Sequence, residues 1–102
     1  MFYRYTLTLL LSLSTFNVFS APHIAINNGR NNDGFARVQI VNKSGTSLAC
    51  YVSINGFKMR FHLPQATTSK WYKATDIRFQ HTDFSSWCGY MENHPEYQKY
   101  VY

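Results

Sequence analysis

The residues best suited to surface chemistry are three basic side chains that alternate along residues 57–63. Lys58, Arg60 and His62 are each separated by one apolar residue, so they share one face of an extended strand. The expected hairpin partner places Tyr51 across from Arg60. Cations beside an aromatic ring can receive an anionic or glycan ligand, although such residues also occupy the solvated face of ordinary sheets. The candidate binding site is therefore Tyr51, Lys58, Arg60 and His62.

Acid–base catalysis would need paired titratable groups, and the closest pair is His81 and Asp83. The two side chains share a face if this segment is a strand, but they diverge if it is helical. We favour a surface pair or a helix cap over a catalytic role, because a His two residues from an Asp often occurs by chance. The chain has no nucleophile elbow, phosphate-binding glycine loop or cofactor fingerprint. We expect a protein that is not an enzyme and uses no cofactor, with a small hydrolase-like enzyme as the alternative.

The two cysteines, Cys50 and Cys88, are expected to form one structural disulfide. A redox or metal role would require a C-x-x-C pair or a ligand spacing such as H-E-x-x-H, and neither occurs. His81 and His94 could only complete a metal site if the fold brought them to the cysteines. In the chain-entropy model, closing a loop of about 39 residues stabilises the fold by roughly 4 kcal/mol. We expect no metal.

Residues 1–20 have the pattern of a signal peptide. Arg4 supplies the positive charge, a leucine-rich apolar run follows, and Val18 and Ser20 are small enough for cleavage after Ser20. A membrane span would need about 18 to 20 uninterrupted apolar residues, and polar residues interrupt this run too early. We expect a secreted or periplasmic protein with no stable membrane insertion after cleavage. The alternative is an uncut signal anchor.

Residues 21–34 carry four Asn and two Gly with little apolar content. Such a composition buries too little surface to offset the entropy of ordering, so it predicts a flexible N-terminal arm. Neither an internal repeat nor a long linker follows. Residues 35–102 are therefore expected to form a single small domain stapled by the disulfide.

Three alternating runs follow, at residues 36–40, 47–54 and 57–63. Residues 43–45 resemble a three-residue hairpin loop, and Asn55-Gly56 is a strong two-residue hairpin signal. These turns predict a three-stranded antiparallel meander with one apolar face. The expected cross-strand pairs are Ile40–Leu48, Val38–Cys50, Leu48–Leu63, Cys50–Phe61, Val52–Met59 and Ile54–Phe57.

The last third of the chain gives weaker signals. Trp71 and Tyr72 predict a short fourth strand. The recurrence of apolar residues over 84–91 at helical spacing predicts a short amphipathic helix, and Pro95 suits the first turn of another. The expected fold is therefore mainly β, a meander of three to four strands under a C-terminal cover of short helices or irregular chain. An α+β arrangement is the alternative.

The net charge of +5 and the aromatic content of 18% also bear on function. Nucleic-acid binding would use both, but export argues against it and the basic residues are spread along the chain. A second contact surface could form from aromatic residues that would otherwise pack in the core. These are Trp71, Tyr72, Trp87 and Tyr90. We expect an exported module that binds a protein or glycan, with a structural component of an envelope or secreted assembly as a further alternative.

Overall fold

The computed structural model describes residues 21–101 and contains six β-strands, among them the segments whose apolar and polar residues alternate. The strands are β1 (Ile24–Arg30), β2 (Ala36–Asn42), β3 (Leu48–Ile54), β4 (Phe57–Leu63), β5 (Tyr72–Lys73) and β6 (Ser85–Tyr90). Helical structure within the described range consists of the 3-10 turns η2 (His81–Asp83), η3 (Met91–Asn93) and η4 (Pro95–Lys99). The predicted leader, residues 1–20, lies outside this range. The mainly β prediction is confirmed.

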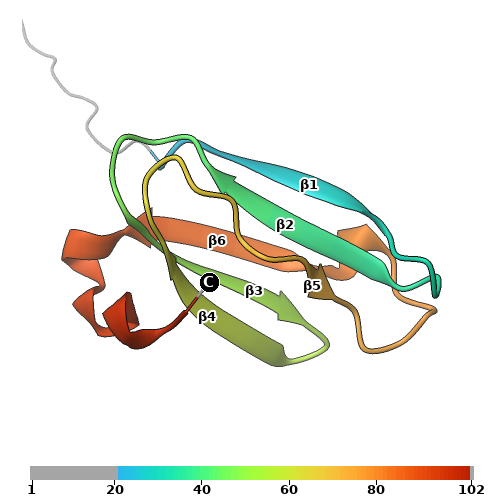
Figure 1. Cartoon of the computed structure of the whole chain (residues 1–102). Helices are drawn as coiled ribbons and strands as arrows, with labels where there is room; N and C mark the ends of the chain where they lie inside the picture. Colours follow the sequence, from blue (N-terminus) through green and yellow to red (C-terminus); the bar gives the residue numbers. More distant parts are fainter. Residues whose placement is uncertain (1–20, 102) are drawn as a thin grey trace, which may run out of the picture.

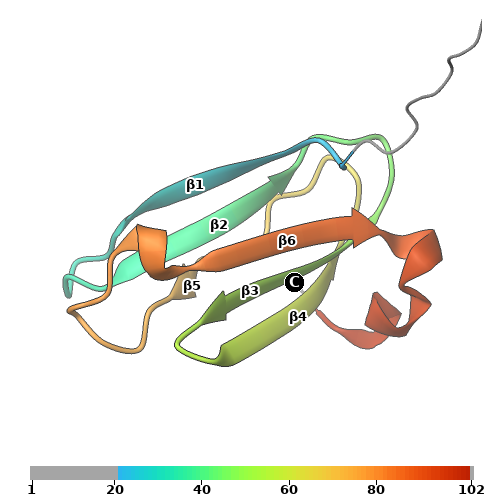
Figure 2. The ribbon, with the colours of Figure 1, turned by 180° about the vertical axis from the view of Figure 1, so that it is seen from behind.

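The strands form two three-stranded antiparallel sheets that face each other (Figures 1 and 2). Sheet A has the order β1-β2-β5, and sheet B has the order β4-β3-β6. The C-terminal 3-10 turns lie at one end of sheet B, beside the end of β6 (Figure 2). Between residues 21 and 101, no helical segment combines the length and the apolar character that a membrane crossing requires.

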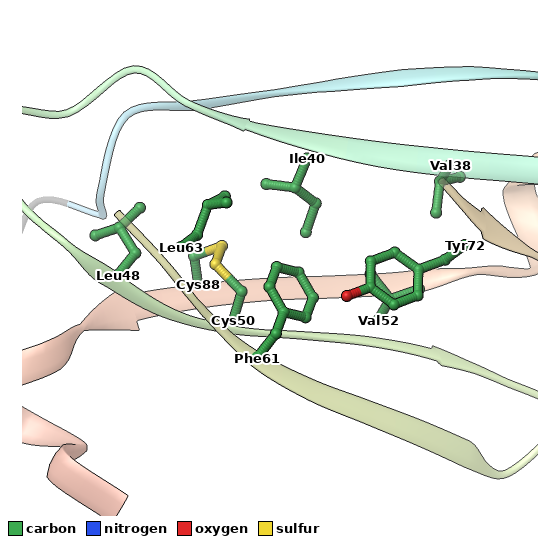
Figure 3. Close-up of a cluster of buried hydrophobic side chains, with 9 residues drawn as sticks. All are labelled: Val38, Ile40, Leu48, Cys50, Val52, Phe61, Leu63, Tyr72 and Cys88. Carbon is green, nitrogen blue, oxygen red and sulfur yellow. A yellow bond between two sulfur atoms is a disulfide. The ribbon is translucent and has the colours of Figure 1, made fainter. Parts of the chain in front are cut away.

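The main hydrophobic core lies between the sheets and is drawn in Figure 3. Sheet A contributes Val38 and Ile40 from β2 and Tyr72 from β5, and the disulfide lies among the side chains of sheet B. The buried members from sheet B are Leu48, Cys50, Val52, Phe61, Leu63 and Cys88. Strands β2 and β3 thus bury the apolar side of their alternating patterns.

The β3–β4 hairpin has the predicted register. Ile54 pairs with Phe57, and the pairing continues to Leu48 with Leu63. Asn55 and Gly56 both have positive φ, at 49° and 83°, as a two-residue turn with the twist of a hairpin requires. All four predicted apolar pairs of this hairpin are confirmed.

The other predicted hairpin is wrong, because residues 43–45 carry the chain from one sheet to the other. Val38 and Ile40 therefore meet the side chains of β3 across the core and not across a strand ladder. The buried side chain of Asn42 holds this crossover. Its amide donates to the carbonyls of Thr46, Leu63 and Pro64 at 2.8, 2.9 and 3.0 Å.

The predicted flexible arm contains strand β1, which pairs with β2 along its whole length. Ile24 packs against the core, and Asn27 donates to Gln39 across the two strands at 3.1 Å. The asparagine-rich stretch after β1 forms a turn, in which the Asn31 side chain accepts from two backbone N–H groups. The prediction of a flexible arm is therefore wrong. It was based on the amino-acid composition of residues 21–34, which does not take account of turn-forming hydrogen bonds from asparagine side chains.

The segment 84–91, predicted as a helix, contains strand β6, so the helix prediction is wrong. Strand β6 pairs with β3 and places Cys88 directly opposite Cys50. The predicted disulfide is confirmed, with 4.1 Å between the two Cα atoms. Pro95 does begin a helical turn, but η4 is a 3-10 turn of five residues.

Candidate functional site

Tyr51 lies at the centre of the outer face of sheet B, the face turned away from the core. Since β3 is the middle strand, neighbours reach this ring from both sides. Lys58, on β4, places Nζ 4.4 Å from the ring centroid. Trp87, on β6, stacks on the ring with centroids 5.4 Å apart and planes inclined by 27°. The two contacts hold Tyr51 between a cation and an indole.

Trp87 lies flat on the sheet because the next outward position on β6 is Gly89. A Cβ on Gly89 would meet Cζ2 and Cη2 of the indole at 2.7 and 2.9 Å. The His94 ring closes the other side, edge-on to Trp87 with centroids 4.9 Å apart. The absence of a side chain at residue 89 therefore fixes where the indole rests.

The C-terminal turns cover one end of this face. Tyr97 is buried, and its ring contacts those of Trp87 and Tyr100. The backbone N–H of His62 donates to the carbonyl of Tyr100 at 3.2 Å, and Nδ1 of His62 contacts the same oxygen. Ala49 beneath this cover is fully buried, although it points to the outer side. The opposite end, near the β3–β4 turn, stays open.

The structure brings together three of the four candidate residues at the open end. Arg60 lies directly across from Tyr51, and Lys58 lies across from Ser53. Both cations are exposed, and Tyr51 is half-buried between its neighbours. His62 shares the face but is engaged by the C-terminal cover. We call the exposed pair Lys58 and Arg60, together with Tyr51, the basic cluster.

Trp87 belongs to this face, and the sequence reasoning did not connect it with Tyr51. Its assignment to a helix separated it from β3. The sequence did contain a signal for a strand here, because two residue sets alternate. These are Ser85, Trp87 and Gly89 on one side and Ser86 and Cys88 on the other. With that assignment, the pairing of Cys50 with Cys88 would have placed Trp87 beside Tyr51.

The strands carry basic residues and no acidic ones. Their five Lys and Arg residues are Arg30, Arg37, Lys58, Arg60 and Lys73. All five acidic residues of the chain lie in connections or 3-10 turns, outside the strands. The one ion pair between residues 21 and 101 joins Arg78 to Asp76 at 2.8 Å. Hydrogen bonds from Arg78 lower the pKa of Asp76 to about 2.

His81 and Asp83, the alternative catalytic pair, both lie in η2 and are exposed. The Asp83 carboxylate accepts the backbone N–H of Gln80 at 2.8 Å and so closes this turn. No pocket is found over residues 21–101, and no three potential metal-binding side chains gather there. The geometry of Asp83 fits the capping interpretation, while the catalytic hypothesis stays a prediction.

The four aromatic residues considered as a second contact surface lie in separate places. Trp71 is on the outer side of sheet A, where it contacts Arg37. Tyr72 points into the core, and burial raises its pKa to about 12. Tyr90 packs against the core from β6. They therefore do not form one patch.

Comparison with known proteins identifies no relative of this chain. The chain matches no protein-family model, no curated protein and no solved structure.

Proposed function

We propose that this protein is an exported, non-enzymatic binding module that docks an acidic surface of a partner protein on the outer face of sheet B. The single observation behind this proposal is the basic cluster. Lys58 and Arg60 are exposed neighbours on β4, and none of the three strands of the sheet contains an acidic residue. Charge complementarity would steer an acidic partner to this face and fix its orientation.

The occupied aromatic rings favour a protein partner over a glycan. A sugar would need an open ring face to stack on, but Tyr51 already has Lys58 on one side and Trp87 on the other. Trp87 is in turn closed in by His94. What remains accessible at the open end is positive charge and the polar edges of serine residues. Ion pairs with carboxylates use such groups directly.

The cluster is held by covalent and packing constraints before any partner arrives. The tight Asn55-Gly56 turn fixes β4 against β3, and the Cys50–Cys88 bond fixes β6 on the other side. Little ordering of the backbone would then be needed on binding. Preorganisation of this kind preserves affinity that a flexible surface would lose.

Affinity capture tests the proposal directly. Mature protein beginning at Ala21 is immobilised and exposed to native extracellular or periplasmic material, and retained proteins are quantified by mass spectrometry. The test variant is K58E/R60E. The control is K43E/R78E, which changes the net charge equally at two exposed positions outside sheet B.

We expect specific acidic proteins to be retained by the wild type and the control variant, and lost from K58E/R60E. Equal retention by all three proteins would overturn the assignment of this face. Retention that survives protease treatment but is removed by glycan-degrading enzymes would instead show a glycan partner, and would refute the choice of a protein.

A further inference from the structure

The outer face of sheet A, on the other side of the sandwich, carries a second group of cations on aromatic rings. The guanidinium carbon of Arg37 lies 4.2 Å from the ring centroid of Trp71. Nζ of Lys73 lies 4.7 Å from the centroid of Phe35. Arg37 and Lys73 are direct cross-strand partners on β2 and β5, so the two cations are neighbours.

Within residues 21–101, the guanidinium of Arg37 is positioned by stacking on Trp71. Arg37 is half-buried, and its Nε is buried without an acceptor within residues 21–101. No carboxylate of residues 21–101 forms an ion pair with Arg37, since the one ion pair in this range joins Arg78 and Asp76. A half-buried cation that lacks a protein counterion is well suited to an external anion.

The surface beside Arg37 is open and flat. Its cross-strand neighbour on β1 is Gly29, where an added Cβ would meet nothing within 4 Å. Next to it, the side-chain amides of Asn27 and Gln39 form a hydrogen-bonded pair, and Gln39 also donates to the carbonyl of Ser69. Amide groups of this kind can hydrogen-bond hydroxyl groups along an extended ligand.

We propose that this face binds an acidic polysaccharide. Trp71 keeps 37% of its surface exposed while Arg37 covers one side of its ring, so a sugar ring can stack on the indole. Carboxylate or sulfate groups of the polymer would pair with Arg37 and Lys73. A flat face suits a repeating polymer.

This inference does not rest on the proposed function, because it uses the opposite sheet and different residues. The two tryptophans of the chain make the faces separable by fluorescence, since Trp71 lies on sheet A and Trp87 on sheet B. The variant W87F leaves only the reporter on sheet A. The variant W71F leaves only the reporter on sheet B.

The test titrates each single-tryptophan variant with polygalacturonate, heparin, neutral dextran and single-stranded oligothymidylate. We expect the acidic polysaccharides to change the emission of Trp71 in W87F, with binding that weakens as salt rises. Dextran and oligothymidylate should leave it unchanged. Emission from Trp87 in W71F should not respond.

Two further changes in the W87F background examine the site itself. R37Q removes the cation, and G29E keeps Arg37 but places a carboxylate beside it in open space. Each should weaken polysaccharide binding about tenfold or more, since an ion pair at the guanidinium is lost. The control R78Q removes one positive charge at an exposed position outside the strands and should bind as W87F does.

Four outcomes would overturn the inference: no response of Trp71 to either acidic polysaccharide, equal binding to dextran, tighter binding to oligothymidylate, or no effect of R37Q and G29E. Failure here leaves the outcome of the K58E/R60E capture unaffected, so the two proposals can fail separately.

Discussion

The indole of Trp87 lies directly over Gly89 on the outer face of sheet B, within 2.9 Å of the place that a Cβ would occupy. The ring thereby spans the space between Tyr51 on the middle strand and His94 at the start of the C-terminal cover. Because Gly89 has no side chain, Trp87 can contact both Tyr51 and His94, and the contact with His94 joins the C-terminal turns to sheet B.

Substitution G89A should destabilise the fold by about 1 to 3 kcal/mol, because the added methyl group would overlap the indole and force it to move. Chemical denaturation followed by far-ultraviolet circular dichroism measures this loss, and near-ultraviolet circular dichroism reports the displaced ring. The matched control is G29A on β1, where the added Cβ meets nothing. It should be neutral or up to about 1 kcal/mol more stable. Equal effects at both glycines would contradict the packing described for Trp87.

Substitution N42A should cost about 2 to 3 kcal/mol, because it leaves the buried carbonyl of Leu63 and its neighbours without their donor. Equilibrium unfolding in urea measures the change. N27A, which removes an exposed amide pair on the same sheet, should stay within about 0.5 kcal/mol of the wild type. A wild-type stability for N42A would mean that Asn42 does not hold the crossover between the sheets.

The role of Asn42 also explains why one hairpin could be predicted and the other could not. Around Asn55-Gly56, turn chemistry and alternation agree, and the same register follows from either. On either side of residues 43–45, the alternation shows which side of each strand is apolar. Two such strands can pair as neighbours in one sheet, or they can lie in different sheets with their apolar sides facing each other across a core. A buried asparagine at the end of β2 selects the second arrangement through contacts distant in sequence.

Strand β6 shows a similar limit. Phe84, Trp87, Cys88 and Met91 have helical spacing, while inward Cys88 and outward Trp87 also fit a strand. The helix would remove Cys88 from the ladder, whereas the strand lets it pair with Cys50 at the centre of sheet B. Tertiary pairing decides between two patterns that the local sequence supports equally. The three residues of the basic cluster could be predicted because they depend only on the β3–β4 hairpin.

Removal of the disulfide in C50A/C88A should lower the free energy of unfolding by about 4 kcal/mol, given a sequence separation of 38 residues. Guanidinium unfolding of the double variant beside the oxidised wild type measures it. The wild type unfolded under reducing conditions should show a similar loss. If neither treatment shifts the midpoint, the bond does not constrain the unfolded chain as described.

Alkaline pH should destabilise the protein through Tyr72. Burial raises the pKa of Tyr72 from 10.0 to about 12 in the folded protein. Between pH 10 and 12 the unfolded chain therefore loses this proton while the folded protein keeps it, so stability falls as pH rises through that window. Free energies of unfolding measured at pH 8 and at pH 11.5 should fall less in Y72F than in the wild type. An identical fall in both proteins would assign the effect to other groups.

Site-specific photo-crosslinking can show whether a protein docks on the outer face of sheet B. A photoreactive amino acid is placed at Ser85, exposed on the outer face of sheet B, or at Asn27, on the outer face of sheet A. In native extracellular or periplasmic material, Ser85 should give discrete protein adducts that disappear when K58E/R60E is added, while Asn27 should give none. Absence of adducts from Ser85, or adducts that persist in the charge-reversed protein, would contradict docking on this face.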